Sequence, residues 1–352
     1  MAEEKPETTA PETVVYVANA GDPSISVLAF DRAKGDVELI EKVAIPGAEE
    51  PSPTSMPLAL TPDRRFLYAA LRSEPFTVVG FAIDPETGKL AHRHSAPLAA
   101  SMAYTAIDRS GRWLLAASYP AGTITVNPID ADGKIGTPAS QTLTDRPKAH
   151  CIALDAANEH AYCAVLEQDL ILQLKFDAAS GKLSPNAPGE IAVKSGAGPR
   201  HLALHPSGRF LYLITETTAT IGAYAIDKKS GALKELQFVN MLAGTPKDKP
   251  AAADLHVTPD GKFLYGSERR TNTLVGFRID PNKGTLALAE RTPTETTPRG
   301  FGIEKRGKFL LAVGLDSHNM TVYAIRPNGS LDPVKQHAMG RNPNWIEFAD
   351  LK

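Results

Sequence analysis

Arginine, histidine and acidic side chains stand at irregular places in this otherwise repetitive chain of 352 residues. A guanidinium group binds phosphate or carboxylate through two parallel hydrogen bonds, so arginines suit an anionic substrate. A histidine or carboxylate beside them could activate water, and an arginine could stabilise the oxyanion that forms when water attacks a carbonyl. The combination therefore favours hydrolysis of a small anionic molecule. A functional role is favoured over a structural one at His150, Arg200, Glu216, Arg269 and Arg299.

A second set of polar residues falls at equally irregular places and is expected to bind substrate together with Arg299. A single loop carboxylate more often lies on a solvated surface or in an ion pair between neighbouring units. His205 and His256 fit hydrogen bonding within a core. The members of this second set are Arg72, Tyr119, His201, Asp254 and His318.

Familiar catalytic and metal-binding motifs are missing from the sequence. GAGPRH (196–201) has the glycines of a phosphate loop but lacks the lysine and the helix that follow in such loops. There is no GxSxG nucleophile elbow and no HExxH or CxxC spacing. We therefore expect no cofactor and no metal, although Asp, Glu and Asn from different repeats could still hold Ca²⁺ or Mg²⁺ on a central axis.

The elements that must position these residues follow from an internal repeat. A short phrase that closes on a glycine hairpin occurs seven times, at steps of 45 to 53 residues. A repeat of this length built from β-strands is typical of a propeller with one sheet per repeat. The seven glycines are Gly35, Gly88, Gly133, Gly181, Gly231, Gly284 and Gly329.

Each repeat contains four short strands, which predicts an all-β, seven-bladed propeller with four antiparallel strands per blade. The chain starts with VVYVANA (14–20), which matches the strand that comes second in each repeat. It ends with NWIEFAD (344–350), which matches the strand that comes first in each repeat. We expect these two strands to pair and close the ring, which leaves no free sheet edge. The first strand of each blade lines the channel. The irregular polar residues then ring its mouth on one face.

Composition limits the partners and the location. The formal charge is −2 and no apolar run approaches the ~20 residues of a membrane span, so we expect neither nucleic-acid nor membrane binding. Residues 1–12 are polar, which predicts a disordered tail before a single domain at 13–352. That tail lacks the apolar stretch of a signal peptide, and the two cysteines, Cys151 and Cys163, fit buried reduced thiols in a cytoplasmic protein.

Five segments resemble the seven-bladed propeller lactonases, a family that includes the bacterial 6-phosphogluconolactonase type and a relative, the fungal carboxymuconate cyclase. The resemblance runs from about Val14 to Phe348. Two departures, Pro120 where relatives often carry Asn and the added charge of Arg270, could alter substrate choice. The segments are SYPAGTITV (118–126), GAGPRHLALHP (196–206), AADLHVTPDGKFLY (252–265), PTETTPRGFGI (293–303) and SHNMTVYAI (317–325).

The resemblance implies a lactone hydrolase that converts 6-phospho-D-glucono-1,5-lactone to 6-phosphogluconate in the pentose phosphate pathway. It implies catalytic roles for four residues: His150 or Glu216 would activate water, and Arg200 or Arg269 would stabilise the oxyanion. Two alternatives stay open. One is an unphosphorylated sugar lactonase or a carboxymuconate-type cyclase, and the other is a binding propeller without catalysis.

Overall fold

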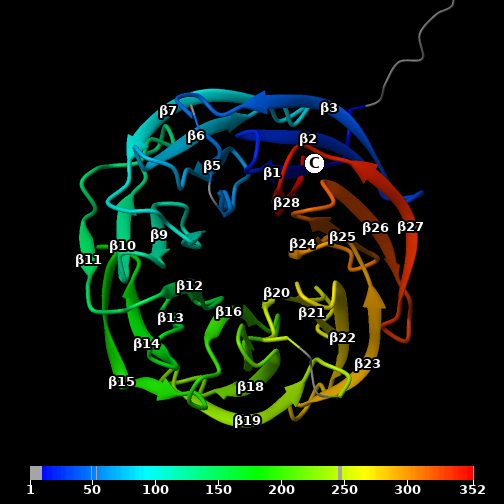
Figure 1. Ribbon diagram of the computed structural model, residues 1–352. Coiled ribbons are helices and arrows are strands. Elements are labelled where there is room, and N and C mark those ends of the chain that lie inside the picture. The colour runs from blue at the N-terminus through cyan, green and yellow to red at the C-terminus, as the bar shows by residue number, and fades with distance from the viewer. Residues whose placement is uncertain (1–9, 49, 53, 245–247, 352) are drawn as a thin grey trace, which may run out of the picture.

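Seven four-stranded antiparallel sheets stand around a common axis, which confirms the predicted seven-bladed propeller (Figure 1). The computed structural model describes residues 10–48, 50–52, 54–244 and 248–351. Within these ranges the chain forms strands, turns and loops, and it has no helix that could cross a membrane. Of the tail predicted at 1–12, residues 1–9 lie outside the described ranges, and 10–12 precede the first strand.

All seven blades have the same strand order from the axis outwards, and the inner strands contact one another in a closed circle. The inner strands are β28 (Pro343–Asp350), β4 (Leu58–Leu60), β8 (Tyr104–Ile107), β12 (Ala149–Leu154), β16 (Pro199–Leu204), β20 (Ala252–Val257) and β24 (Pro298–Ile303). The second strands are β1 (Thr13–Asn19), β5 (Phe66–Ala70), β9 (Trp113–Ser118), β13 (His160–Val165), β17 (Phe210–Thr215), β21 (Phe263–Glu268) and β25 (Phe309–Gly314).

The outer half of each blade is the hairpin that carries the repeated glycine. The third strands are β2 (Ser24–Asp31), β6 (Thr77–Ile83), β10 (Thr123–Pro128), β14 (Leu170–Asp177), β18 (Thr220–Ile226), β22 (Thr273–Ile279) and β26 (Asn319–Ile325). The outer strands are β3 (Asp36–Ala44), β7 (Leu90–Pro97), β11 (Gln141–Leu143), β15 (Lys182–Ala192), β19 (Leu233–Asn240), β23 (Leu286–Pro293) and β27 (Leu331–Ala338).

The two ends of the chain close the ring as predicted. Strand β28 pairs antiparallel with β1, from Thr13 opposite Asp350 to Asn19 opposite Pro343. The Thr13 hydroxyl donates to the Asp350 carboxylate at 3.0 Å, and Arg32 forms an ion pair with the same carboxylate. The first blade therefore depends on residues from both ends of the sequence, so the ring has no free inner edge.

The repeated glycines fasten each blade to the one before it. All seven have φ between +66° and +87°, a backbone conformation that favours glycine. A side chain at any of them would overlap a residue on the second strand of the preceding blade, such as Phe210 beneath Gly284. Five of these second strands also carry a buried tyrosine whose hydroxyl donates to the glycine carbonyl at 2.7–3.1 Å, as Tyr212 does to Gly284. The repeat seen in the sequence is thus the contact between blades.

The hydrophobic cores lie between neighbouring blades, because each blade buries both faces of its inner three strands. One core, for example, joins Val27 of β2 to Phe81 of β6 in the next blade. Cys151 and Cys163 lie on the adjacent strands β12 and β13, where both are buried and free, as predicted. Burial raises the pKa of the Cys151 thiol to about 12, which keeps it protonated and unreactive.

Substituting one repeated glycine tests the contact between blades. Gly284→Ala places a methyl group against the Phe210 ring, whereas Gly208→Ala has the same backbone conformation (φ +69° against +70°) with open space around the new atom. Both variants bear the left-handed backbone cost of roughly 1–2 kcal/mol. Only Gly284→Ala also overpacks the contact, which should lower the free energy of unfolding by a further ~1–3 kcal/mol. We expect urea unfolding to show that extra loss for Gly284→Ala, and equal losses would contradict the proposed role of the contact.

Candidate functional site

Four of the predicted site residues lie in β-bulges at the start of inner strands. In β12, β16 and β24 the pairing with the second strand skips one residue, which is His150, Arg200 and Arg299 respectively. In β20 the pairing skips Ala253 and Asp254. A bulge redirects the side chain of the unpaired residue away from the alternation of the strand. Four consecutive blades therefore place their irregular residues at one end of the channel.

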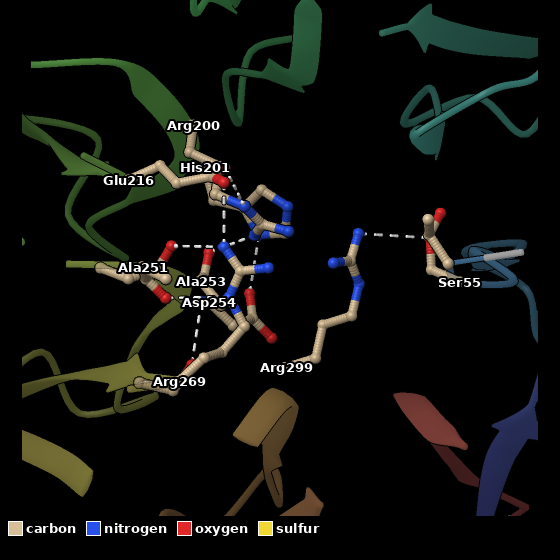
Figure 2. A network of polar contacts seen from close by, with 12 residues as sticks. Ser55, Arg200, His201, Glu216, Ala251, Ala253, Asp254, Arg269 and Arg299 are labelled. Carbon is tan, nitrogen blue, oxygen red and sulfur yellow. Dashed lines mark hydrogen bonds and ion pairs between the residues drawn. The ribbon is translucent and has the colours of Figure 1, made fainter. Parts of the chain in front are cut away.

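Glu216 joins two of the predicted arginines in a compact cluster (Figure 2). One carboxylate oxygen accepts from Arg200 Nε at 3.0 Å, and the other pairs with Arg269 at 3.0 Å. Both arginines also bind backbone carbonyl groups. Arg200 donates to the Ala253 carbonyl, and Arg269 Nε donates to the Ala251 carbonyl at 2.8 Å. Glu216 and Arg269 directly follow β17 and β21, so the cluster spans two blades.

Arg200 and Glu216 are both charged at neutral pH. Burial, together with the neighbouring Arg269, lowers the pKa of Arg200 to about 10. Burial by itself would raise the pKa of Glu216, but the two arginines outweigh it and lower that pKa. The cluster thus carries a net positive charge, and its carboxylate has both oxygens committed to ion pairs.

Arg72 and Arg299 converge on one serine hydroxyl from different blades. Arg72 donates to Ser55 Oγ at 2.9 Å and to Ser101 Oγ at 3.0 Å, and Arg299 reaches Ser55 Oγ at 3.5 Å. Figure 2 shows Arg299 extending between the Arg200 cluster and Ser55. Neither arginine forms an ion pair with a carboxylate of the described residues. Burial lowers the pKa of Arg72 to about 10. Burial, together with the charges of the other arginines, lowers the pKa of Arg299 well below its usual value.

Asp254 holds two histidines, one on each side. Its Oδ1 accepts from His201 Nδ1 at 2.8 Å, and its Oδ2 accepts from His256 Nε2 at 3.1 Å. Burial lowers the pKa of His201 to about 4, helped by the charge of Arg200. Burial also opposes the charged form of His256, but the Asp254 carboxylate more than offsets this and raises its pKa. His201 is therefore a neutral imidazole at pH 7.

His150 lies against His201, with their ring centroids 5.1 Å apart, and Tyr119 packs edge-on to His150 at 5.8 Å. His150 is 4% exposed, and its Nδ1 has no hydrogen-bond partner among the described residues. Burial, followed by the charge of Arg200, lowers the pKa of His150 well below its usual value. His150 is thus neutral, with no carboxylate to fix its tautomer.

Of the three other histidines considered in the sequence analysis, two lie apart from these contacts and one joins them. His318 is exposed on the loop between β25 and β26, where its Nδ1 accepts the backbone N–H of Asn342 at 3.2 Å. His205 is buried and bonds to Ser207 and to the Gly261 carbonyl, as expected for a core histidine. His256, expected to satisfy core hydrogen bonds, instead pairs with the Asp254 carboxylate of the site.

Sequence reasoning missed the serines that hold Arg72, and it missed Asn344. Ser55 belongs to the loop before the inner strand β4. Other candidates were chosen from loops at the same place in their blades, so the position of Ser55 in the sequence could have identified it. Asn344 is skipped by the pairing of β28 with β1, as the bulged candidates are in their own blades. Its amide oxygen accepts the N–H of Met56 at 2.9 Å, so Asn344 anchors the loop that presents Ser55.

A metal site was left open as an alternative in the channel. Within residues 10–48, 50–52, 54–244 and 248–351, no three His, Cys, Asp or Glu side chains are grouped so that they could hold a metal ion.

Comparison with known proteins agrees with the fold and extends over nearly the whole chain. The family described as "Lactonase, 7-bladed beta-propeller" matches residues 47–348. The chain is 36% identical over 342 residues to a 6-phosphogluconolactonase of Pectobacterium atrosepticum, covering 97% of this chain and 99% of that protein. A 6-phosphogluconolactonase of Erwinia tasmaniensis is 34% identical over 339 residues, covering 96% and 99%.

Among solved structures, the periplasmic gluconolactonase of Pseudomonas aeruginosa superposes with a TM-score of 0.88 at 25% identity, covering 97% of this chain and 99% of that one. The resemblance carried by the sequence segments is therefore confirmed by full-length relatives and by the fold. The chain belongs to the family of seven-bladed β-propeller lactonases.

Proposed function

We propose that this lactonase hydrolyses 6-phospho-D-glucono-1,5-lactone to 6-phosphogluconate. The observation that carries the proposal is the pair Arg72 and Arg299, two guanidinium groups that converge on Ser55 and have only hydroxyl partners among the described side chains. A phosphate dianion between them would satisfy both charges through charge-assisted hydrogen bonds. The names of the relatives, which are called 6-phosphogluconolactonases, support the same substrate.

This substrate suggests a cellular place for the reaction, the pentose phosphate pathway in the cytoplasm. A sugar phosphate carries charge that a lipid bilayer excludes, so the enzyme would act where the phosphate ester is made. The Pseudomonas aeruginosa relative is described as periplasmic and as a gluconolactonase, so it differs in both respects.

In the proposed reaction, the arginine cluster stabilises the charge that develops on the carbonyl oxygen of the lactone. Arg200 is fixed by Glu216 and by the Ala253 carbonyl, so it is preorganised and needs little rearrangement. Glu216 is poorly placed to take a proton from water because each of its oxygens is already in an ion pair. Of the two bases left open by the sequence, the neutral imidazole of His150 is the better proton acceptor, and the equally neutral His201 joins it as a candidate.

An unphosphorylated sugar lactone is the second candidate substrate, favoured by the structural similarity to a gluconolactonase. Rates on the phosphorylated and the unphosphorylated gluconolactone, followed by proton release, separate the two candidates. A carboxymuconate-type cyclase or a binding propeller would hydrolyse neither lactone above the spontaneous rate, and that outcome would overturn the proposal.

Arg299→Ala tests the phosphate site. Removing one charge-assisted contact costs about 1.5–3 kcal/mol, so we expect kcat/KM for the phosphorylated lactone to fall roughly 10- to 100-fold. The effect on the unphosphorylated lactone should be much smaller, because that substrate has no group for Arg299 to bind. Arg209→Ala, on an exposed turn between an inner and a second strand, is the matched control for loss of one positive charge. An equal loss on both substrates would exclude a phosphate role for Arg299.

Glu216→Gln tests the structural role of the carboxylate. Because the folded-state pKa of Glu216 is lowered, its charge stabilises the protein above its unfolded pKa, and this contribution is lost as the pH falls through the folded value. We expect the variant to be less stable than wild type at pH 7, by about 1–3 kcal/mol. Chemical unfolding at pH 7 and at pH 4 should show the difference shrinking at the lower pH. A difference that grows on acidification would contradict the ion pairs.

A further inference from the structure

We propose that His201, held by Asp254, is the general base that activates the hydrolytic water, and that His256 positions Asp254 through the second carboxylate oxygen. The assignment rests on the proposed lactone hydrolysis and differs from the substrate-binding role predicted from the sequence. The assignment is based on a chain of two hydrogen bonds across two adjacent blades, which connects His201 to Asp254 and Asp254 to His256.

The hydrogen bond from His201 to Asp254 fixes the tautomer of the imidazole. A carboxylate can only accept, so Nδ1 carries the hydrogen and donates at 2.8 Å. Nε2 is then left with a free lone pair, the form that a general base needs. His201 is 5% exposed, and its Nε2 is buried without a hydrogen-bond partner among the described residues.

His201 lines a small cavity together with Arg200 and Arg299. Its volume is about 10 Å³, enough for no more than one water molecule. Such a water would donate to His201 Nε2 and accept from the Arg200 guanidinium. Arg200 thereby links the cavity to the cluster that stabilises the oxyanion. The cavity therefore combines a proton acceptor with donors at the place where water must be activated.

Asp254 is fixed more firmly than any other carboxylate of the site. Besides the two histidines, it accepts the N–H of Leu255 at 2.9 Å and the N–H of Phe301 at 3.2 Å. Burial would raise its pKa, but His256 and His201 outweigh burial and hold the pKa well below its usual value. The carboxylate therefore stays ionised and can stabilise the imidazolium that His201 becomes. His150 has no such partner, which makes it the weaker base.

The step balances without another reactant. His201 Nε2 takes a proton from water as the water oxygen bonds to the lactone carbonyl carbon, and the carbonyl π electrons move to the oxygen beside the arginines. When the tetrahedral intermediate collapses, the bond from that carbon to the ring oxygen breaks, and the ring oxygen takes the proton from the imidazolium. The product is a carboxylic acid, which ionises and releases one proton to solvent.

Charged and titratable groups surround His201 on every strand packed against it. They are His150 on β12, Arg200 on its own strand β16, Asp254 and His256 on β20, Arg299 on β24 and Tyr104 on β8, with Glu347 of β28 facing His256. Loss of a positive neighbour makes protonation of His201 easier, and loss of a negative neighbour makes it harder.

Asp254→Asn is the principal test. An amide can donate to Nδ1, which places the hydrogen on Nε2 and removes the base. We expect kcat to fall roughly 10²- to 10⁴-fold with little change in KM, on whichever lactone the wild type hydrolyses. His201→Gln should lose a similar factor, and the double variant should lose no more than either single variant. His205→Gln, which removes a buried histidine just beyond the opposite end of β16, is the matched control and should keep its activity.

His256→Asn gives a readout that a purely structural role would not produce. Removing a positive charge beside Asp254 raises the pKa of His201, so the acid limb of the kcat/KM profile should move to higher pH. An unmoved limb in a folded, active His256→Asn protein would overturn the arrangement. If the wild type is active and the Asp254→Asn variant keeps full activity, the assignment of His201 as the base is overturned, but the proposed function is not. A wild type that hydrolyses no lactone would overturn both this inference and the proposed function.

Discussion

The contact between a left-handed glycine of one blade and the second strand of the preceding blade is the constraint on which the rest of the molecule depends. It recurs at all seven junctions, and five of them add a buried hydrogen bond from a tyrosine to the glycine carbonyl. A sheet of four strands cannot bury both faces alone, so each blade needs its neighbours. Because the ring is closed by β28 and β1, a shift at one junction would have to be absorbed by the other six.

That rigidity matters because the site is assembled from several blades. His150, Arg200, Asp254 and Arg299 come from four consecutive inner strands, and Arg72 with Ser55 comes from a fifth blade. Bulges at the starts of the four strands turn these side chains out of the sheet pattern. The regular part of each strand builds the wall of the channel, and the irregular first residues form the candidate site.

The site holds more buried positive charge than its carboxylates balance. Glu216 is shared by Arg200 and Arg269, and Asp254 is shared by two histidines, so Arg72 and Arg299 have hydroxyl partners instead. Such an arrangement is costly in the empty protein, and the proposed anionic substrate would offset that cost. Burial, reinforced by the same excess charge, keeps His150 and His201 neutral, so the imidazoles remain able to accept a proton at neutral pH.

The sequence by itself determined the propeller, its seven blades, its closure and the loops from which the site residues come. These properties follow from local patterns, since the glycine hairpins and strand phrases recur every 45 to 53 residues and each has a fixed place in a blade. Only the tertiary structure decided which residues are partners. His201 and Asp254 are 53 positions apart, and Glu216 could be read as a base until its two ion pairs were seen. Bulges and partners depend on the register between strands and on side chains from neighbouring blades, and no local pattern in the chain encodes either.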